Sequence, residues 1–113
     1  EGMELDVIRG ATKTISTHLP ILFVENNKPN GSPELVTALF DLGYKCWWHI
    51  APYYNPNNFF KNETNIFSRC SPEANMLCIH ESRATDIKFP KVLNANDNWV
   101  EVIKRIRAQN ANA

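Results

Sequence analysis

The chain has 113 residues, a length that suits one domain. Twelve lysines and arginines balance twelve aspartates and glutamates, so the net charge gives no argument for a nucleic acid or an anionic membrane as a partner. The three cysteines are an odd number and lack the spacing of a disulfide framework. Nothing in the sequence resembles a signal peptide. No apolar run approaches the roughly 20 residues that span a bilayer. These features predict a cytoplasmic protein with reduced thiols.

The first residues predict a tight turn that leads into a helix over residues 3–17. Gly2 suits such a turn, or a close approach to a ligand, because it has no Cβ atom. Apolar residues then recur at spacings of three and four, the period of a helix. These residues are Leu5, Ile8, Ala11 and Ile15. Glu1 is therefore expected at the carboxyl end of a strand that the chain lacks, which is the edge of an α/β sheet where ligands bind.

A strand is predicted next, at residues 21–24. This stretch is continuously apolar, as is typical of a strand that is covered on both faces. Glu25 and Asn26 fall at its carboxyl end, and residues 26–31 have the composition of a turn. The polar side chains at this strand end are thus candidates for a ligand site.

A second helix and a second strand follow the turn. Ser32 and Pro33 are typical of an N-cap and a first helical residue. Gly43 is placed to end the helix in the C′ position. Residues 44–50 are rich in aromatic side chains and predict the second strand.

The remainder of the chain is expected to hold a long loop, a third strand and a closing helix. Residues 51–71 mix asparagine, proline and aromatic residues with no period, and their aromatic content argues against disorder. Residues 75–79 predict the third strand. The closing helix carries Trp99 and later apolar residues, and Asn96 or Asp97 is its expected N-cap. The order of elements predicts an α/β fold whose first strands are parallel.

The stretch Glu1-Gly2-Met3-Glu4, followed by an apolar pair and then Gly10-Ala11, resembles the second half of a family motif. That motif, Asp-x-Glu-Gly-x-Glu-x-x-Val-Leu-x-Gly-Ala, belongs to the FkbM-type methyltransferases, which are S-adenosylmethionine-dependent enzymes of the Rossmann-like class. Further stretches resemble this family up to about His80. They are residues 20–25, 42–44, 58–60, 65–67 and 75–79.

The resemblance implies a Rossmann-like methyltransferase fold of which only the C-terminal part is present. Residues 1–113 would then form a three-stranded mixed sheet with flanking helices, in which the last strand returns antiparallel between the two before it. The family's Asp before Glu1 and its earlier cofactor-binding part are absent, so the chain alone is expected to be inactive. The implied cofactor is S-adenosylmethionine, and the implied reaction is O-methylation of a small molecule or glycan. A complete small α/β domain is the rival interpretation.

Two carboxylates are the candidate catalytic residues. Methyl transfer needs an acceptor held against the methyl carbon and a group that takes the acceptor's proton. Glu1 and Glu25 are expected to face each other across the crevice at the strand ends, and negative charge there favours the cationic cofactor. The alternatives are that Glu1 is only an acid at a helix start and that Glu25 only binds loop amides.

The predicted substrate-binding residues are Asn26 and four residues of the long loop. Aromatic rings cover apolar C–H surfaces of sugars and polyols, and amides bond their hydroxyl groups. The loop residues are Tyr53, Tyr54, Asn58 and Phe59. The loop is expected to lie over the strand ends as a lid, or alternatively to be held only by its own aromatic packing. A second functional hypothesis is a non-catalytic α/β module that binds carbohydrate through this loop.

The histidines do not predict a metal site. His18, His49 and His80 are scattered, and the spacing from Cys78 to His80 is not that of a zinc site. His49 ends a strand and is either a base or a structural residue.

Overall fold

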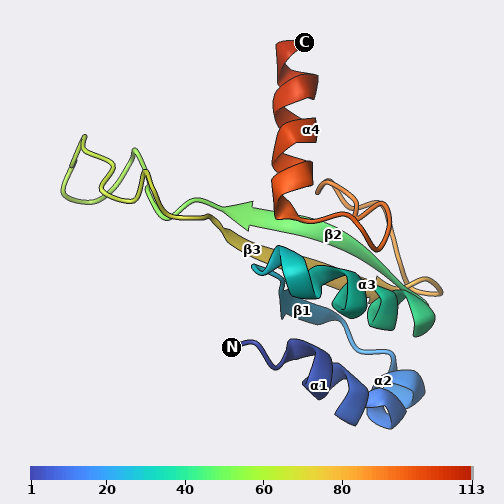
Figure 1. Ribbon diagram of the computed structural model, residues 1–113. Coiled ribbons are helices and arrows are strands. Elements are labelled where there is room, and N and C mark those ends of the chain that lie inside the picture. Colours follow the sequence, from blue (N-terminus) through green and yellow to red (C-terminus); the bar gives the residue numbers. More distant parts are fainter. Residues whose placement is uncertain (113) are drawn as a thin grey trace.

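A computed structural model describes residues 1–112, which form a three-stranded antiparallel sheet with four α-helices and a short 3₁₀ helix (Figure 1). The strands are β1 (Leu22–Glu25), β2 (Tyr44–Ala51) and β3 (Glu73–His80). The helices are α1 (Glu4–Gly10), α2 (Thr12–His18), the 3₁₀ helix η1 (Pro29–Gly31), α3 (Ser32–Asp41) and α4 (Trp99–Ala111). None of these helices has the length and apolar character that crossing a membrane requires.

The strand order in the sheet is β1-β3-β2. Both outer strands pair antiparallel with β3, so β1 and β2 run in the same direction without touching. The predicted position of the last strand, antiparallel between the first two, is confirmed. The prediction of a mixed sheet is wrong, because β3 separates the two strands that share a direction.

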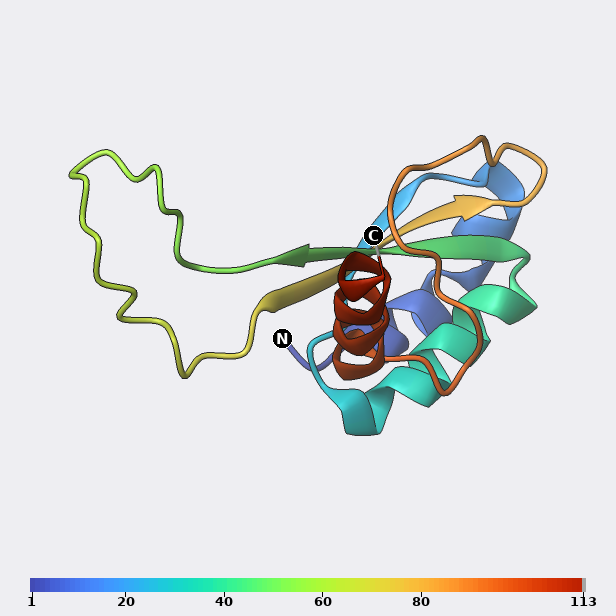
Figure 2. The same ribbon diagram turned by 90° about the horizontal axis from the view of Figure 1, so that it is seen from above.

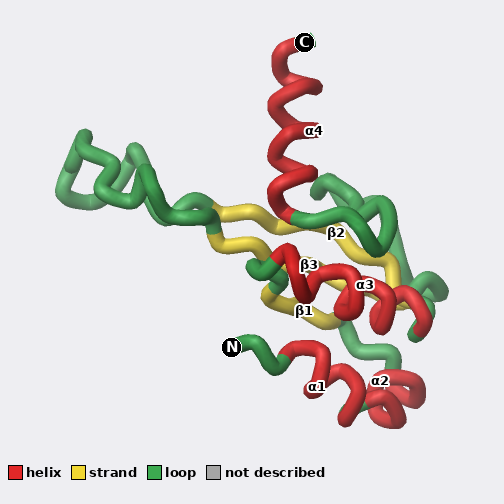
Figure 3. Tube along the Cα trace, viewed as in Figure 1, coloured by secondary structure: helices red, strands yellow, loops and turns green. Residues whose placement is uncertain are grey.

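The hydrophobic core lies between one face of the sheet and the helices α1, α2 and α3 (Figure 3). Alternate residues of each strand face this layer, and Val24, Met76 and Trp48 stand side by side across the three strands. The largest fully buried side chains of the core are Trp48, Leu39, Met76, Val36, Val92 and Val102. Val102 belongs to α4, whose later turns project away from the sheet (Figure 1).

The predicted helix over residues 3–17 is two helices in the structure, with a junction at Ala11. The Thr12 hydroxyl donates to the carbonyl oxygens of Arg9 at 2.8 Å and Ile8 at 3.2 Å. Such bonds compete with the regular helical hydrogen bonds and bend helices. The apolar period continues through the bend, which is why periodicity alone predicted one helix.

The sequence predicted Ser32 as the N-cap of α3. In the structure it is the first helical residue instead. Gly31 precedes it, and no side chain caps this helix. The Ser32 side chain is buried, accepts a hydrogen bond from Asn26 Nδ2 at 2.8 Å and donates to the carbonyl oxygen of Asp97 at 3.3 Å. Ser32 therefore joins the turn after β1 to the segment before α4.

Gly43 ends α3 in the left-handed region, with φ of 81°, as predicted. A Cβ atom at this position would lie 2.7 Å from His80 Nε2. We expect Gly43→Ala to lower the free energy of unfolding by about 2 kcal/mol, because the left-handed conformation and the contact with His80 both oppose a side chain. Urea denaturation measures this change.

Gly10→Ala is the matched control for that prediction. Gly10 lies at the end of α1, and nothing stands within 4 Å of the position of an added Cβ atom. This substitution should leave stability unchanged or raise it by up to about 1 kcal/mol. Equal losses in the two variants would contradict a special role for Gly43.

The N-cap of α4 is Asn98, whereas the sequence predicted Asn96 or Asp97. Asn98 Oδ1 accepts hydrogen bonds from the backbone N–H groups of Val100 at 3.0 Å and Glu101 at 3.2 Å. Asp97 turns inward instead and is buried. An aspartate and an asparagine offer similar capping oxygens, so sequence alone did not separate them.

Candidate functional site

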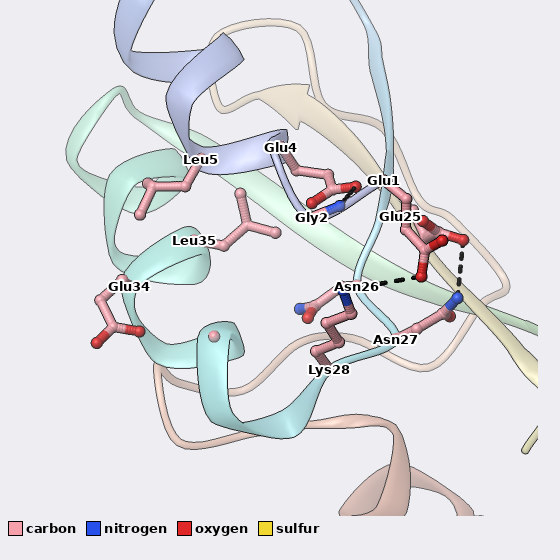
Figure 4. Close-up of a pocket in the computed structure, with 11 residues that line it drawn as sticks. Glu1, Gly2, Glu4, Leu5, Glu25, Asn26, Asn27, Lys28, Glu34 and Leu35 are labelled. Carbon is pink, nitrogen blue, oxygen red and sulfur yellow. Dashed lines mark hydrogen bonds and ion pairs between the residues drawn. The ribbon is translucent and has the colours of Figure 1, made fainter.

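A pocket of about 180 Å³ opens where β1 ends and α1 begins (Figure 4). The turn after β1 and the start of α3 complete its wall. Its charged lining residues are Glu1, Glu4, Glu25, Lys28 and Glu34. The structure thus brings Glu1 and Glu25 to one pocket, as predicted, in a setting that has four carboxylates and one lysine.

Glu1 and Lys28 face each other across the mouth of this pocket. Their Oε1 and Nζ atoms are 3.7 Å apart, and both side chains are largely exposed. Gly2 has φ of 77°, and a Cβ atom on it would lie 3.2 Å from Lys28 Nζ, so glycine allows the lysine to approach. Lys28 was not predicted to belong to the site, although a lone cation within the turn-rich residues 26–31 was an available signal. A water-exposed pair of this kind contributes little to stability and leaves Glu1 free to contact a ligand.

Glu25 is held by the turn that follows β1. Its Oε1 atom accepts a hydrogen bond from Asn27 Nδ2 at 2.7 Å, and Asn27 Oδ1 accepts from the Ala74 backbone N–H at 2.7 Å. This arrangement fixes the carboxylate at the end of the strand (Figure 4). Glu25 is half-buried and lines the pocket, so it can be both anchored and available to a ligand.

Glu4 supports the first turn of α1. Its Oε1 atom accepts a hydrogen bond from the Gly2 backbone N–H at 3.1 Å. Hydrogen bonding from its own backbone N–H, and then from that of Gly2, lowers the pKa of Glu4. The carboxylate therefore stays ionised to lower pH than an ordinary glutamate and adds negative charge to the pocket.

Asn26 is buried and serves the packing of the turn. Its backbone N–H donates to the Ala74 carbonyl oxygen at 2.8 Å, and its Nδ2 atom donates to Ser32 Oγ and lies 3.5 Å from Met76 Sδ. We assign Asn26 a structural role in the pocket wall. Its predicted contact with a substrate stays a prediction.

A row of polar side chains crosses the opposite face of the sheet at the same edge. Glu25, Asn75 and His49 lie in one register across β1, β3 and β2. The His49 ring stands edge-on to the rings of Phe23 and Phe89, with centroids 5.7 and 5.5 Å away. Its Nδ1 atom is buried and has no hydrogen-bond partner among the described residues. This nitrogen is thus a buried polar atom that the described residues leave without a hydrogen bond.

The long loop, residues 52–72, forms an arm that projects from the sheet (Figure 2). It leaves from the carboxyl end of β2, at the same sheet edge as Glu25. The arm extends outward, however, and none of its residues lines the pocket around Glu1. The predicted lid is thus at the predicted edge but does not cover the strand ends in this structure.

The arm encloses a hollow of its own, of about 490 Å³, to which Tyr53, Tyr54 and Asn58 contribute. The Tyr54 hydroxyl lies 2.9 Å from the Asn62 carbonyl oxygen. Asn58 Nδ2 donates to the Asn62 carbonyl oxygen at 2.8 Å, and its Oδ1 atom accepts from the Asn62 N–H. These bonds hold the arm together, so the polar groups of Tyr54 and Asn58 are already engaged.

Phe59 lies outside that hollow. Its side chain is 89% exposed and packs edge-on against the ring of Phe60 at 5.2 Å. Tyr53 is half-exposed and tilts against Phe67. The structure therefore separates the predicted substrate-binding residues into Asn26 in the pocket wall, three residues at the hollow, and Phe59 on the outer surface of the arm.

The described residues contain no group of three or more histidine, cysteine, aspartate or glutamate side chains that could hold a metal ion. Searches against family models, curated proteins and solved structures found no match for this chain. The candidate site is therefore defined by its geometry alone.

Proposed function

We propose that the chain is the C-terminal portion of an S-adenosylmethionine-dependent methyltransferase of the FkbM type, which O-methylates a small molecule or glycan. The observation that carries the proposal is the strand order β1-β3-β2, with β3 antiparallel to both neighbours. That order is the one that the resemblance to this family implies. An ordinary antiparallel meander would have placed β2 between β1 and β3 instead.

The free edge of β1 supports a longer domain. Among the described residues, β1 pairs only with β3, and an apolar groove of about 310 Å³ runs between α1 and this strand. Met3, Val7 and Phe23 line the groove, and each is at least 60% exposed. A preceding strand that ends near Glu1 would cover these side chains and bond the free edge. In the proposed domain, that strand belongs to the cofactor-binding part.

The pocket supports the proposed chemistry. Its four carboxylates favour a cation such as the sulfonium group of the cofactor. Glu1 is exposed and could take the acceptor's proton, while anchored Glu25 would orient the acceptor.

Turnover by the protein encoded in the whole reading frame tests this proposal. We expect release of S-adenosylhomocysteine from S-adenosylmethionine when hydroxyl-bearing acceptors, including glycans, are supplied. A protein that binds glycans yet releases no S-adenosylhomocysteine with any of them would favour the non-catalytic carbohydrate module.

A further inference from the structure

Two cysteines lie directly opposite each other in the centre of the sheet. Cys46 in β2 pairs with Cys78 in β3, and both side chains are fully buried on the core face. Both are free thiols. The notable feature is their position within the hydrogen-bond ladder, because it sets the distance between the side chains.

The pair occupies a site where the strands do not exchange backbone hydrogen bonds. The Cys46 carbonyl accepts from the Val92 N–H at 2.9 Å, and the Trp48 N–H donates to the Pro90 carbonyl at 2.7 Å, both on the side of β2 away from β3. In antiparallel strands the two backbone groups of a residue point to the same side. Cys46 and Cys78 are therefore a non-hydrogen-bonded pair, for which Cα atoms lie about 4.5 Å apart and the side chains approach most closely. That spacing is within the range that a disulfide bridges, about 4.4 to 6.8 Å.

We propose that Cys46 and Cys78 are a reversible oxidation site, at which a peroxide converts the two thiols into a cross-strand disulfide. The Cys46 side chain is fully buried, but Cys46, unlike Cys78, borders a surface hollow of about 260 Å³ between the end of α3 and the start of β2, and we expect a small oxidant to enter from this side. The adjacent Cys46 thiol, followed by burial, raises the pKa of Cys78, so Cys78 suits the role of the resolving thiol rather than the first nucleophile.

The reaction balances with one peroxide. The Cys46 sulfur attacks a peroxide oxygen, forming an S–O bond as the O–O bond breaks, and one water leaves. The Cys78 sulfur then attacks the Cys46 sulfur, forming the S–S bond as the S–O bond breaks, and a second water leaves. The two thiols together lose two electrons and two protons. The product closes a loop over residues 46–78, which contains the whole arm.

The test uses the chain with Cys70→Ser, since Cys70 is exposed and would react independently. After hydrogen peroxide treatment, we expect an intact mass two hydrogens lower and no alkylation in denaturant. Trypsin can cut the arm after Lys61 and Arg69, so digestion without reductant should yield peptides 46–61 and 70–83 joined by a disulfide. Dithiothreitol should reverse these changes. The cross-link should also raise Tm by on the order of 10 °C, because it restricts the unfolded chain.

Cys46→Ala in the same background is the control, and it should show neither the linked peptides nor the rise in Tm. Two alternative results would overturn the proposal: both thiols remain open to alkylation after peroxide treatment, or Cys46 is oxidised to a sulfinic acid without any link to Cys78. Disulfide-linked dimers of the Cys70→Ser chain would overturn it as well, because the two thiols would then prefer other partners.

Discussion

Asp97→Ala should lower the free energy of unfolding by about 3 to 5 kcal/mol, with a fall in Tm on the order of 15 °C. The Asp97 side chain is 2% exposed. Its Oδ1 atom accepts from Arg105 Nη1 at 2.7 Å, and its Oδ2 atom accepts from Trp48 Nε1 at 3.3 Å and from the Leu93 N–H at 3.0 Å. Removing it leaves a partly buried guanidinium and two donors without their partner. Thermal and urea denaturation measure the loss.

Glu101→Ala is the control for this variant. Glu101 forms an ion pair with Lys104 at 2.8 Å on the exposed surface of α4, so its loss should cost no more than about 1 kcal/mol. A similar small effect for Asp97→Ala would contradict the role assigned to the buried network.

Glu1→Gln should reduce turnover of the longer protein by roughly 100-fold or more, while its free energy of unfolding changes by less than about 0.5 kcal/mol. The substitution keeps the size of the side chain and removes its charge and basicity. Glu1 is largely exposed at the pocket mouth, and its one ion pair, with Lys28, is long and exposed to water. The experiment compares kcat and KM for the acceptor with the urea denaturation curve.

Asp6→Asn separates this role from a simple helix-start effect. Asp6 is an exposed acid in the first turn of α1 that does not line the pocket. If Glu1 acts only through the helix dipole, the two substitutions should have equally small effects on kcat. A large loss for Glu1→Gln alone supports proton transfer or acceptor orientation at this residue.

The positions of the three strands could be predicted from the sequence to within two residues. Residues 21–24, 44–50 and 75–79 were expected, and the strands are Leu22–Glu25, Tyr44–Ala51 and Glu73–His80. Apolar and aromatic residues marked these stretches as strands, but the prediction that β1 is covered on both faces is wrong, because Phe23 is 60% exposed. The strand order was available only from the resemblance, because periodicity does not encode which strands become neighbours.

The polar details depend on partners that are distant in sequence. Asp97 and Ser32 are residue types that commonly cap helices, yet the side chain of each turns inward to partners on other elements. Arg105 on α4 likewise pairs with Asp97, eight residues earlier in the chain. The direction of the arm also could not be predicted, since its hydrogen bonds are internal and leave its orientation to the strands at its base.

Calorimetric titration with S-adenosylmethionine is the most direct test of the proposed function. It should be carried out on the protein encoded by the whole reading frame and, in parallel, on residues 1–113. The proposal predicts micromolar binding by the longer protein and no appreciable binding by residues 1–113, in which no glycine-rich turn follows a strand. Micromolar binding by residues 1–113 alone, or no binding by the longer protein, would contradict the proposal that this chain is the C-terminal portion of a methyltransferase.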